Sequence, residues 1–241
     1  MQLVQLAAEV WVAARSAASP AGLRRKAVVG ENNAMSQELA VTRRSLHGVA
    51  ELVLAGPQYR ATGKLRLGVV PGGFASTLAP RLRVDGNRVA SAEGVTVGID
   101  GRSPRALGAE LGVAAGRPEG MYDGGSGVDL DETLVVDSDQ AGVITGALAL
   151  GHDALVAFAP GESPVLWPEH FDVAIRVQDM NFGVSPGDGF IEEPYAYVGI
   201  ASPPAGDMFW NAPFGAAVPL RELADAPTVT RFFSEGRDRA R

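Results

Sequence analysis

The feature that most constrains the fold is a repeated pattern of short strands joined by tight turns. Leu65, Leu67 and Val69 alternate with polar or small residues, and residues 81–84 alternate in the same way. Such alternation is typical of strands with one buried face. Residues 85–87 (Asp-Gly-Asn) then offer the conformations that a tight hairpin requires. Because no helix pattern separates these strands, we predict an antiparallel sheet rather than a parallel, doubly wound one.

Helix patterns bracket the strands. Residues 36–54 carry apolar side chains three and four positions apart, and Gly56-Pro57 supplies a stop signal. Helix N-caps are predicted at Ser103, Asp137 and Asp225, the first and last with a proline close behind. The remaining apolar segments of the second half predict strands at 165–177, 181–185, 194–201 and 214–219.

These elements predict one α+β domain over residues 35–241, with helices packed on one face of the sheet. It contains two helix-strands-helix halves, at about 36–112 and 137–241, joined by a linker rich in glycine and aspartate. The linker lacks the strand and helix flanks of a phosphate-binding loop. Residues 1–34 are expected to form a poorly packed N-terminal extension.

Composition excludes several classes of function. The 241 residues include no cysteine, so disulfides, thiolate nucleophiles and cysteine-bound metals are ruled out. No apolar run reaches the roughly 18 residues of a membrane span, and we expect a soluble, cytoplasmic protein. A formal charge of −7 disfavours nucleic-acid binding, and the basic cluster Arg24-Arg25-Lys26 is interpreted as a solvated charge run.

Residues 165–215 are the most informative stretch for function. They hold nine of the 16 aromatic side chains: Trp167, Phe171, Phe182, Phe190, Tyr195, Tyr197, Phe209, Trp210 and Phe214. In a continuous strand His170 and Asp172 would share one face, about 7 Å apart by strand rise. A carboxylate can fix the tautomer of an imidazole and raise its basicity, which suits an acid/base pair. The alternative is a histidine that only joins strand to loop.

Other polar and aromatic residues of this stretch are candidates for ligand binding. Tyr195 and Tyr197 would share a face of the next strand. Large aromatics with polar tips beside carboxylates are typical of a concave small-ligand site, although they also occur in cores where their hydroxyls find partners. The candidate ligand-binding residues are Trp167, Glu169, Asp188, Tyr195, Tyr197, Trp210 and Asn211.

Metal and nucleophile chemistry receive weaker support. The chain has only three histidines, His47, His152 and His170, and no HExxH motif, so we predict no metal site and name no cofactor. Ser185 lies in Gly-Val-Ser-Pro-Gly, but Pro186 removes a backbone N–H where a nucleophile elbow needs one, so a turn is predicted there.

Four motifs carry a resemblance to a known family. They are LWPEHFD at 166–172, GVSPGD at 183–188, EPYAYVG at 193–199 and FWNAPFGA at 209–216. With them the chain resembles a bacterial, mainly actinobacterial, family of conserved proteins of unknown function, over about residues 39–238. The resemblance implies no activity, cofactor or catalytic residue, and residues 1–34 lie outside it.

Three classes of function therefore remain. The first is binding of a small molecule in an aromatic and polar pocket around His170. The second is a small-molecule enzyme with His170 and Asp172 as its acid/base pair. The third is a protein-partner module, which would need an exposed apolar patch instead of a pocket.

Overall fold

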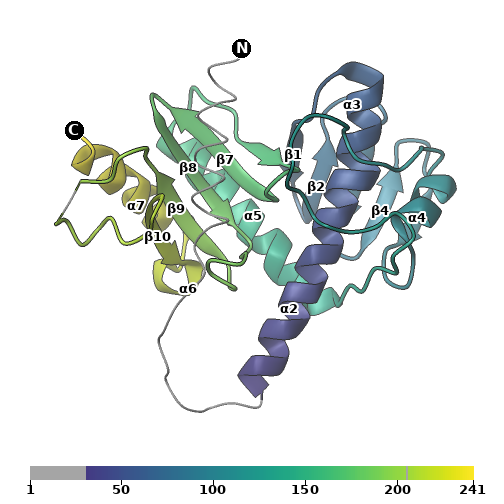
Figure 1. Ribbon diagram of the computed structural model, residues 1–241, viewed down its shortest axis with the longest axis horizontal. Helices are drawn as coiled ribbons and strands as arrows, with labels where there is room; N and C mark the ends of the chain where they lie inside the picture. The colour runs from purple at the N-terminus through teal and green to yellow at the C-terminus, as the bar shows by residue number, and fades with distance from the viewer. Residues whose placement is uncertain (1–30, 205) are drawn as a thin grey trace.

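The computed structural model describes residues 31–204 and 206–241. The prediction of a poorly packed extension therefore falls almost entirely outside the described residues. Within them the chain forms one ten-stranded antiparallel sheet in the order β10-β9-β8-β7-β6-β1-β2-β3-β4-β5, with helices packed against it. The predicted α+β class with an antiparallel sheet is confirmed (Figure 1).

The two halves of the chain follow the same plan: a long helical segment and five strands in meander order, followed by one helix in the first half and two in the second. Their first strands, β1 and β6, meet antiparallel at the centre of the sheet through one residue pair, Leu67 with Leu166. The bounds of the first half are α2 (Glu31–Gly48), η1 (Val49–Ala55), α3 (Gly56–Thr62), β1 (Leu67–Val70), β2 (Gly73–Ser76), β3 (Leu82–Asp85), β4 (Arg88–Ser91), β5 (Thr96–Gly98) and α4 (Pro104–Glu110).

The second half begins with a helix that joins the halves. This helix, α5, packs on β7 and β8 of its own half, on β1 and β2 of the other, and on α2. Figure 1 shows it behind the green strands of the second half. The bounds are α5 (Ser138–Phe158), β6 (Val165–Trp167), β7 (Asp172–Val177), β8 (Met180–Ser185), β9 (Tyr195–Gly199), β10 (Gly215–Pro219), α6 (Leu220–Leu223) and α7 (Ala226–Arg239).

The helix caps form as the sequence predicts. Ser103 accepts a hydrogen bond from the Ala106 amide, Asp137 from those of Asp139 and Gln140, and Asp225 from that of Thr228. Between α4 and α5, residues 112–136 contain no helix or strand, as expected of the linker. The linker is nevertheless tied to the first half, because the Gly116 amide donates to the Leu52 carbonyl.

Two predicted elements need correction. The strand predicted at 165–177 is a hairpin, β6 and β7, with a turn at 168–171 in which Phe171 adopts a positive φ of 55°. The helix predicted at 36–54 begins at Glu31 and continues to Thr62. Gly56-Pro57 does not end it, because the π-helical segment η1 precedes Pro57 and a new α-helical segment starts there, with Pro57 in the first turn where its missing N–H is tolerated.

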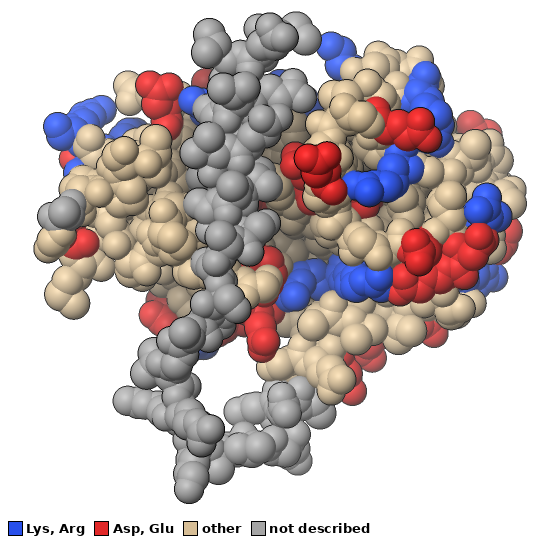
Figure 2. Space-filling view, viewed as in Figure 1, with Lys and Arg blue, Asp and Glu red and all other residues tan. Residues whose placement is uncertain are grey.

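The large buried core is mostly apolar. One large apolar cluster on the helix side of the sheet contains residues from both halves. α5 is long and apolar enough to cross a membrane by length and composition, but half of its most apolar window is buried inside the protein. On the face that Figure 2 shows, basic and acidic side chains lie next to each other outside the grey region. Ion pairs of this kind include Arg44–Glu132, Arg102–Glu110 and Arg105–Asp131.

Candidate functional site

Tyr195 and Tyr197 lie on the face of β9 opposite the helices, as the alternation predicts. Both are fully buried, and their ring centroids are 6.2 Å apart. The Tyr197 hydroxyl donates to Oδ2 of Asp172 over 2.5 Å, and the Tyr195 hydroxyl donates to Oδ2 of Asp188 over 2.6 Å. Hydrogen bonds to a carboxylate are short and strong. Each tyrosine is therefore matched to one of the predicted acidic residues.

A glycine on the neighbouring strand makes room for Tyr197. Gly183 of β8 pairs with Tyr197, and a Cβ at Gly183 would lie 2.5 Å from the Tyr197 hydroxyl. The ring can therefore lie across the sheet and reach Asp172 on β7. Phe214 covers it edge-on, and Phe190 packs on Phe214 from the loop after β8. The arrangement is a small second core on the outer face of the sheet.

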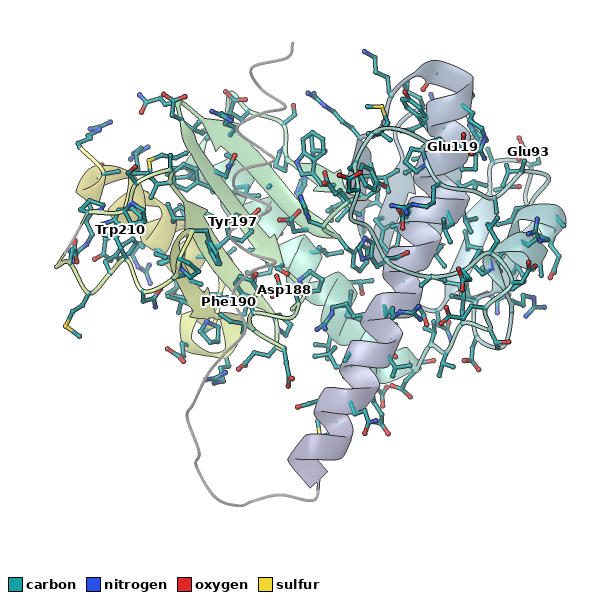
Figure 3. The ribbon with its side chains drawn as sticks, in the orientation of Figure 1. Glu93, Glu119, Asp188, Phe190, Tyr197 and Trp210 are labelled. Carbon is teal, nitrogen blue, oxygen red and sulfur yellow. The ribbon has the colours of Figure 1, made fainter. Side chains whose placement is uncertain are left out.

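Trp210 and Asn211 do not join this group. Trp210 packs edge-on against Phe209, at 4.9 Å between ring centroids, and belongs with the helix-side core. Figure 3 shows it close to α7 and away from Tyr197 and Asp188. The Asn211 amide bonds twice to the backbone of Ala217, donating to its carbonyl and accepting from its N–H, which fixes the loop before β10.

His170 and Glu169 lie in the turn between β6 and β7. Their side chains are 22% and 25% exposed, and Nε2 of His170 is 3.6 Å from Oε2 of Glu169. The expectation that His170 and Asp172 share a strand face is wrong, because His170 precedes the strand. Asp172 opens β7 and is 1% exposed. Glu169 and His170 are thus partly exposed and lie next in the chain to a buried carboxylate.

The sequence analysis missed a polar stripe on the first half, where Arg43, His47 and Glu51 follow one another at intervals of four along α2 and η1. Nε2 of His47 is 2.8 Å from the Pro168 carbonyl, and the ring stacks on Phe171 at 5.4 Å. Because a carbonyl only accepts, Nε2 carries the proton and Nδ1 is left as an acceptor.

The surroundings of His47 keep it neutral. Burial lowers the pKa of His47 from its ordinary value of 6.5 to about 4, and the positive charge of a protonated His170 acts in the same direction. The Pro168 carbonyl and the carboxylates of Glu51 and Asp172 oppose the shift without cancelling it. His47 is therefore an uncharged hydrogen-bonding group at neutral pH.

Glu51 is a carboxylate inside the protein, 1% exposed, in the π-helical segment η1. It accepts from Nε of Arg117 at 3.1 Å, from the Ser126 amide at 2.9 Å and from the Ser126 hydroxyl at 2.6 Å. A buried charge is tolerated only with such partners. Single π-helical turns occur frequently at functional sites, which adds to the interest of this residue.

Tyr122 completes the surroundings of Glu51. Its hydroxyl is fully buried, and it lies beside the Glu51 carboxylate without the geometry of a hydrogen bond to it. Burial, with Glu51 and Glu169 nearby, raises the pKa of Tyr122 far above its ordinary value, although Arg117 acts in the opposite direction. The phenol therefore stays protonated.

Arg43, the first member of the stripe, holds the loop after β8. Its guanidinium donates to the Glu192 carbonyl at 2.7 Å, with Asp188 and Tyr195 nearby. A Cβ at Gly187 would lie 2.5 Å from Nη1 of Arg43, so glycine is needed there for this approach. Desolvation by burial lowers the pKa of Arg43. Arg43 thus connects α2 of the first half to the loop that covers the tyrosines.

We call one group of residues from both halves the polar seam: His47, Glu51, Tyr122, Glu169, His170 and Asp172. Two signals in the sequence could have found its first-half members. Polar residues recur every four positions at 43, 47 and 51, and Glu51 interrupts the apolar run at 49–55. Neither signal predicts which residues would contact Glu51. Tyr122, for example, comes from the irregular linker, where no sequence pattern predicts its position.

No large cavity among those found lies at the polar seam. Two surface hollows of about 410 and 490 Å³ lie elsewhere, one beside β5 and α4 and one beside α7. Among residues 31–204 and 206–241, no three histidine, aspartate or glutamate side chains are placed to hold a metal ion.

Comparisons with protein-family models, with curated proteins and with solved structures gave no match for this chain. The resemblance carried by the four motifs therefore stays a prediction.

Proposed function

We propose that the protein binds a small polar molecule at the polar seam, with Glu169 and His170 at its entrance. Support comes from the convergence of chemistry-bearing groups contributed by both halves of the chain. Binding sites form preferentially where two structural units meet, and buried titratable groups with perturbed pKa values are typical of them. The proposed site keeps the predicted location around His170. Its innermost residues are now His47, Glu51 and Tyr122.

One observation carries the proposal. The buried Tyr122 hydroxyl makes no hydrogen bond, and none of the described residues bonds to Nδ1 of His47, although both groups lie near Glu51. Buried polar groups are nearly always satisfied, so the open hydroxyl of Tyr122 beside a buried carboxylate supports a bound partner. A purely structural network would close these bonds within the protein.

The test is a thermal-shift screen of pooled metabolites on the wild type and two variants. A ligand at a hundredfold excess over its dissociation constant stabilises the folded state by about 2.7 kcal/mol. We expect at least one pool to raise the melting temperature of the wild type. The shift should be lost in Tyr122→Phe and in His47→Gln, both of which retain the size of the side chain.

Tyr59→Phe is the matched control, because Tyr59 on α3 makes no side-chain hydrogen bond among the described residues. It should keep the full shift. The proposal fails if no pool stabilises the wild type, or if the shift survives in both seam variants.

A further inference from the structure

We infer that residues 206–214, the edge loop, close β10 against pairing with a second copy of the chain. The inference concerns the surface at β10 and does not depend on the polar seam. β10 is the last strand at one end of the sheet. An edge strand presents a row of backbone N–H and C=O groups, to which a strand of another chain can bond.

The register of β10 with β9 shows which of its residues face outward. The Ile200 amide donates to the Phe214 carbonyl directly before β10. Between antiparallel strands such bonds recur at every second residue. Residues 216 and 218 therefore bond to their partners on β9. The residues of β10 whose backbone groups point away from the sheet are Gly215, Ala217 and Pro219.

Each of these three positions is closed in a different way. The Ala212 amide donates to the Gly215 carbonyl at 2.9 Å, and the Gly215 amide donates to the Ala212 carbonyl at 3.0 Å. The Ala217 amide donates to Oδ1 of Asn211 at 2.9 Å, and Nδ2 of Asn211 donates to the Ala217 carbonyl at 3.0 Å. Pro219 has no N–H. These positions therefore offer no free donor to a strand of another chain.

Asn211 takes the place that one residue of a further strand would occupy. Its side-chain amide carries a donor and an acceptor, as a peptide group does. The rest of the edge loop is held by α7, because Arg239 donates to the Asp207 carboxylate at 2.9 and 3.1 Å and the Phe209 ring lies 5.4 Å from that of Phe232. Loss of the Asn211 amide should therefore expose Ala217 without releasing the loop.

The partner that this arrangement excludes is β10 of a second copy. With a two-fold axis beside Ala217, the Ala217 residues of two copies would lie opposite each other and exchange two hydrogen bonds. Asn211 occupies both of these groups in each copy. At the other end of the sheet β5 has only three residues, and shortness itself limits pairing at an edge. β10 has five residues and needs a cover.

The experiment measures self-association of the full chain by analytical ultracentrifugation over a range of protein concentrations. Asn211→Ala removes both hydrogen bonds to Ala217 and leaves no buried cavity, because Asn211 is exposed. We expect this variant to associate about tenfold more tightly than the wild type, or more. Adding Ala217→Pro should restore the wild-type behaviour, because proline has no N–H and is tolerated at an outward-facing position of an edge strand.

Asn87→Ala is the matched control, since Asn87 donates to the Ser138 hydroxyl and not to a strand edge. It should associate like the wild type. The inference is wrong if folded Asn211→Ala associates no more tightly than the wild type, or if Ala217→Pro does not reverse the association. Native-state hydrogen exchange tests the wild type directly. Its Ala217 amide should be protected, and exchange at the rate of a free peptide would overturn the inference even if no variant folds.

Discussion

At the scale of single residues, removing the hydrogen bond between Tyr197 and Asp172 tests the second core most directly. Tyr197→Phe removes a donor to a carboxylate that is 1% exposed. Losing a hydrogen bond to a buried charged group costs roughly 1.5–3 kcal/mol. We expect urea unfolding to show this loss, and Tyr59→Phe to change stability by less than about 0.5 kcal/mol. Equal effects in the two variants would mean that the bond contributes nothing.

His47 should make stability depend on pH. Its pKa is about 4 in the folded protein and ordinarily 6.5, so between these values the unfolded chain binds more protons. The free energy of unfolding must therefore fall as the pH drops from 6.5 to 4, by up to about 3 kcal/mol from this residue. His47→Gln should flatten that part of the curve, whereas loss of the surface imidazole in His152→Gln should not. A wild-type curve that is flat over this range would contradict the neutral state of His47 in the folded protein.

At the scale of elements, two glycines of α5 should respond in opposite ways to the same substitution. A Cβ at Gly151 would lie 2.6 Å from Cβ of Val184, where the helix packs on the sheet. Overpacking of this kind costs about 1–3 kcal/mol. Gly146 faces open space, so alanine there should stabilise the helix by roughly 0.5–1 kcal/mol. Thermal unfolding of Gly151→Ala and Gly146→Ala checks both signs, and destabilisation by both would show that the helix is packed differently.

The elements also show how far sequence reasoning reaches. Hairpins, caps and alternating strands were predictable because their signals are local, as at residues 85–87 and at Ser103. The turn at 168–171 was missed because Phe171, a bulky residue, adopts a left-handed backbone conformation, which is rare for such residues. In this conformation its ring contacts His47 and Phe74, and these tertiary contacts cannot be read from the local sequence. The continuation of the helix past Pro57 was missed because a π-helical turn has no clear sequence signature.

The candidate site was predictable only in part. The motif residues on the second half were found because they cluster in sequence, and four of them do meet in pairs, Asp172 with Tyr197 and Asp188 with Tyr195. The first-half members were missed because their partners come from distant segments. Glu51 meets Ser126 across 75 positions of the chain, and no local pattern encodes such a contact.

At the scale of the whole molecule, three connections of unequal strength between the halves can be named within residues 31–204 and 206–241. The sheet itself contributes one residue pair between β1 and β6. α5 contributes more, because it packs on strands of both halves, and α2 adds Arg43 and His47, which bond to the second half. The helices rather than the sheet must therefore carry most of the coupling between halves.

The coupling of the two halves through helices predicts how the molecule unfolds. If α5 couples the halves, the slowest-exchanging amides of β2 and β3 and those of β8 and β9 should share one free energy of opening, equal to that of global unfolding. Gly151→Ala perturbs α5 where it packs on β7 and β8, yet it should lower protection in β2 and β3 by the same amount. Native-state hydrogen exchange with residue resolution measures both quantities. Protection lost in β8 and β9 alone would show that the single pair between β1 and β6 lets the halves unfold separately.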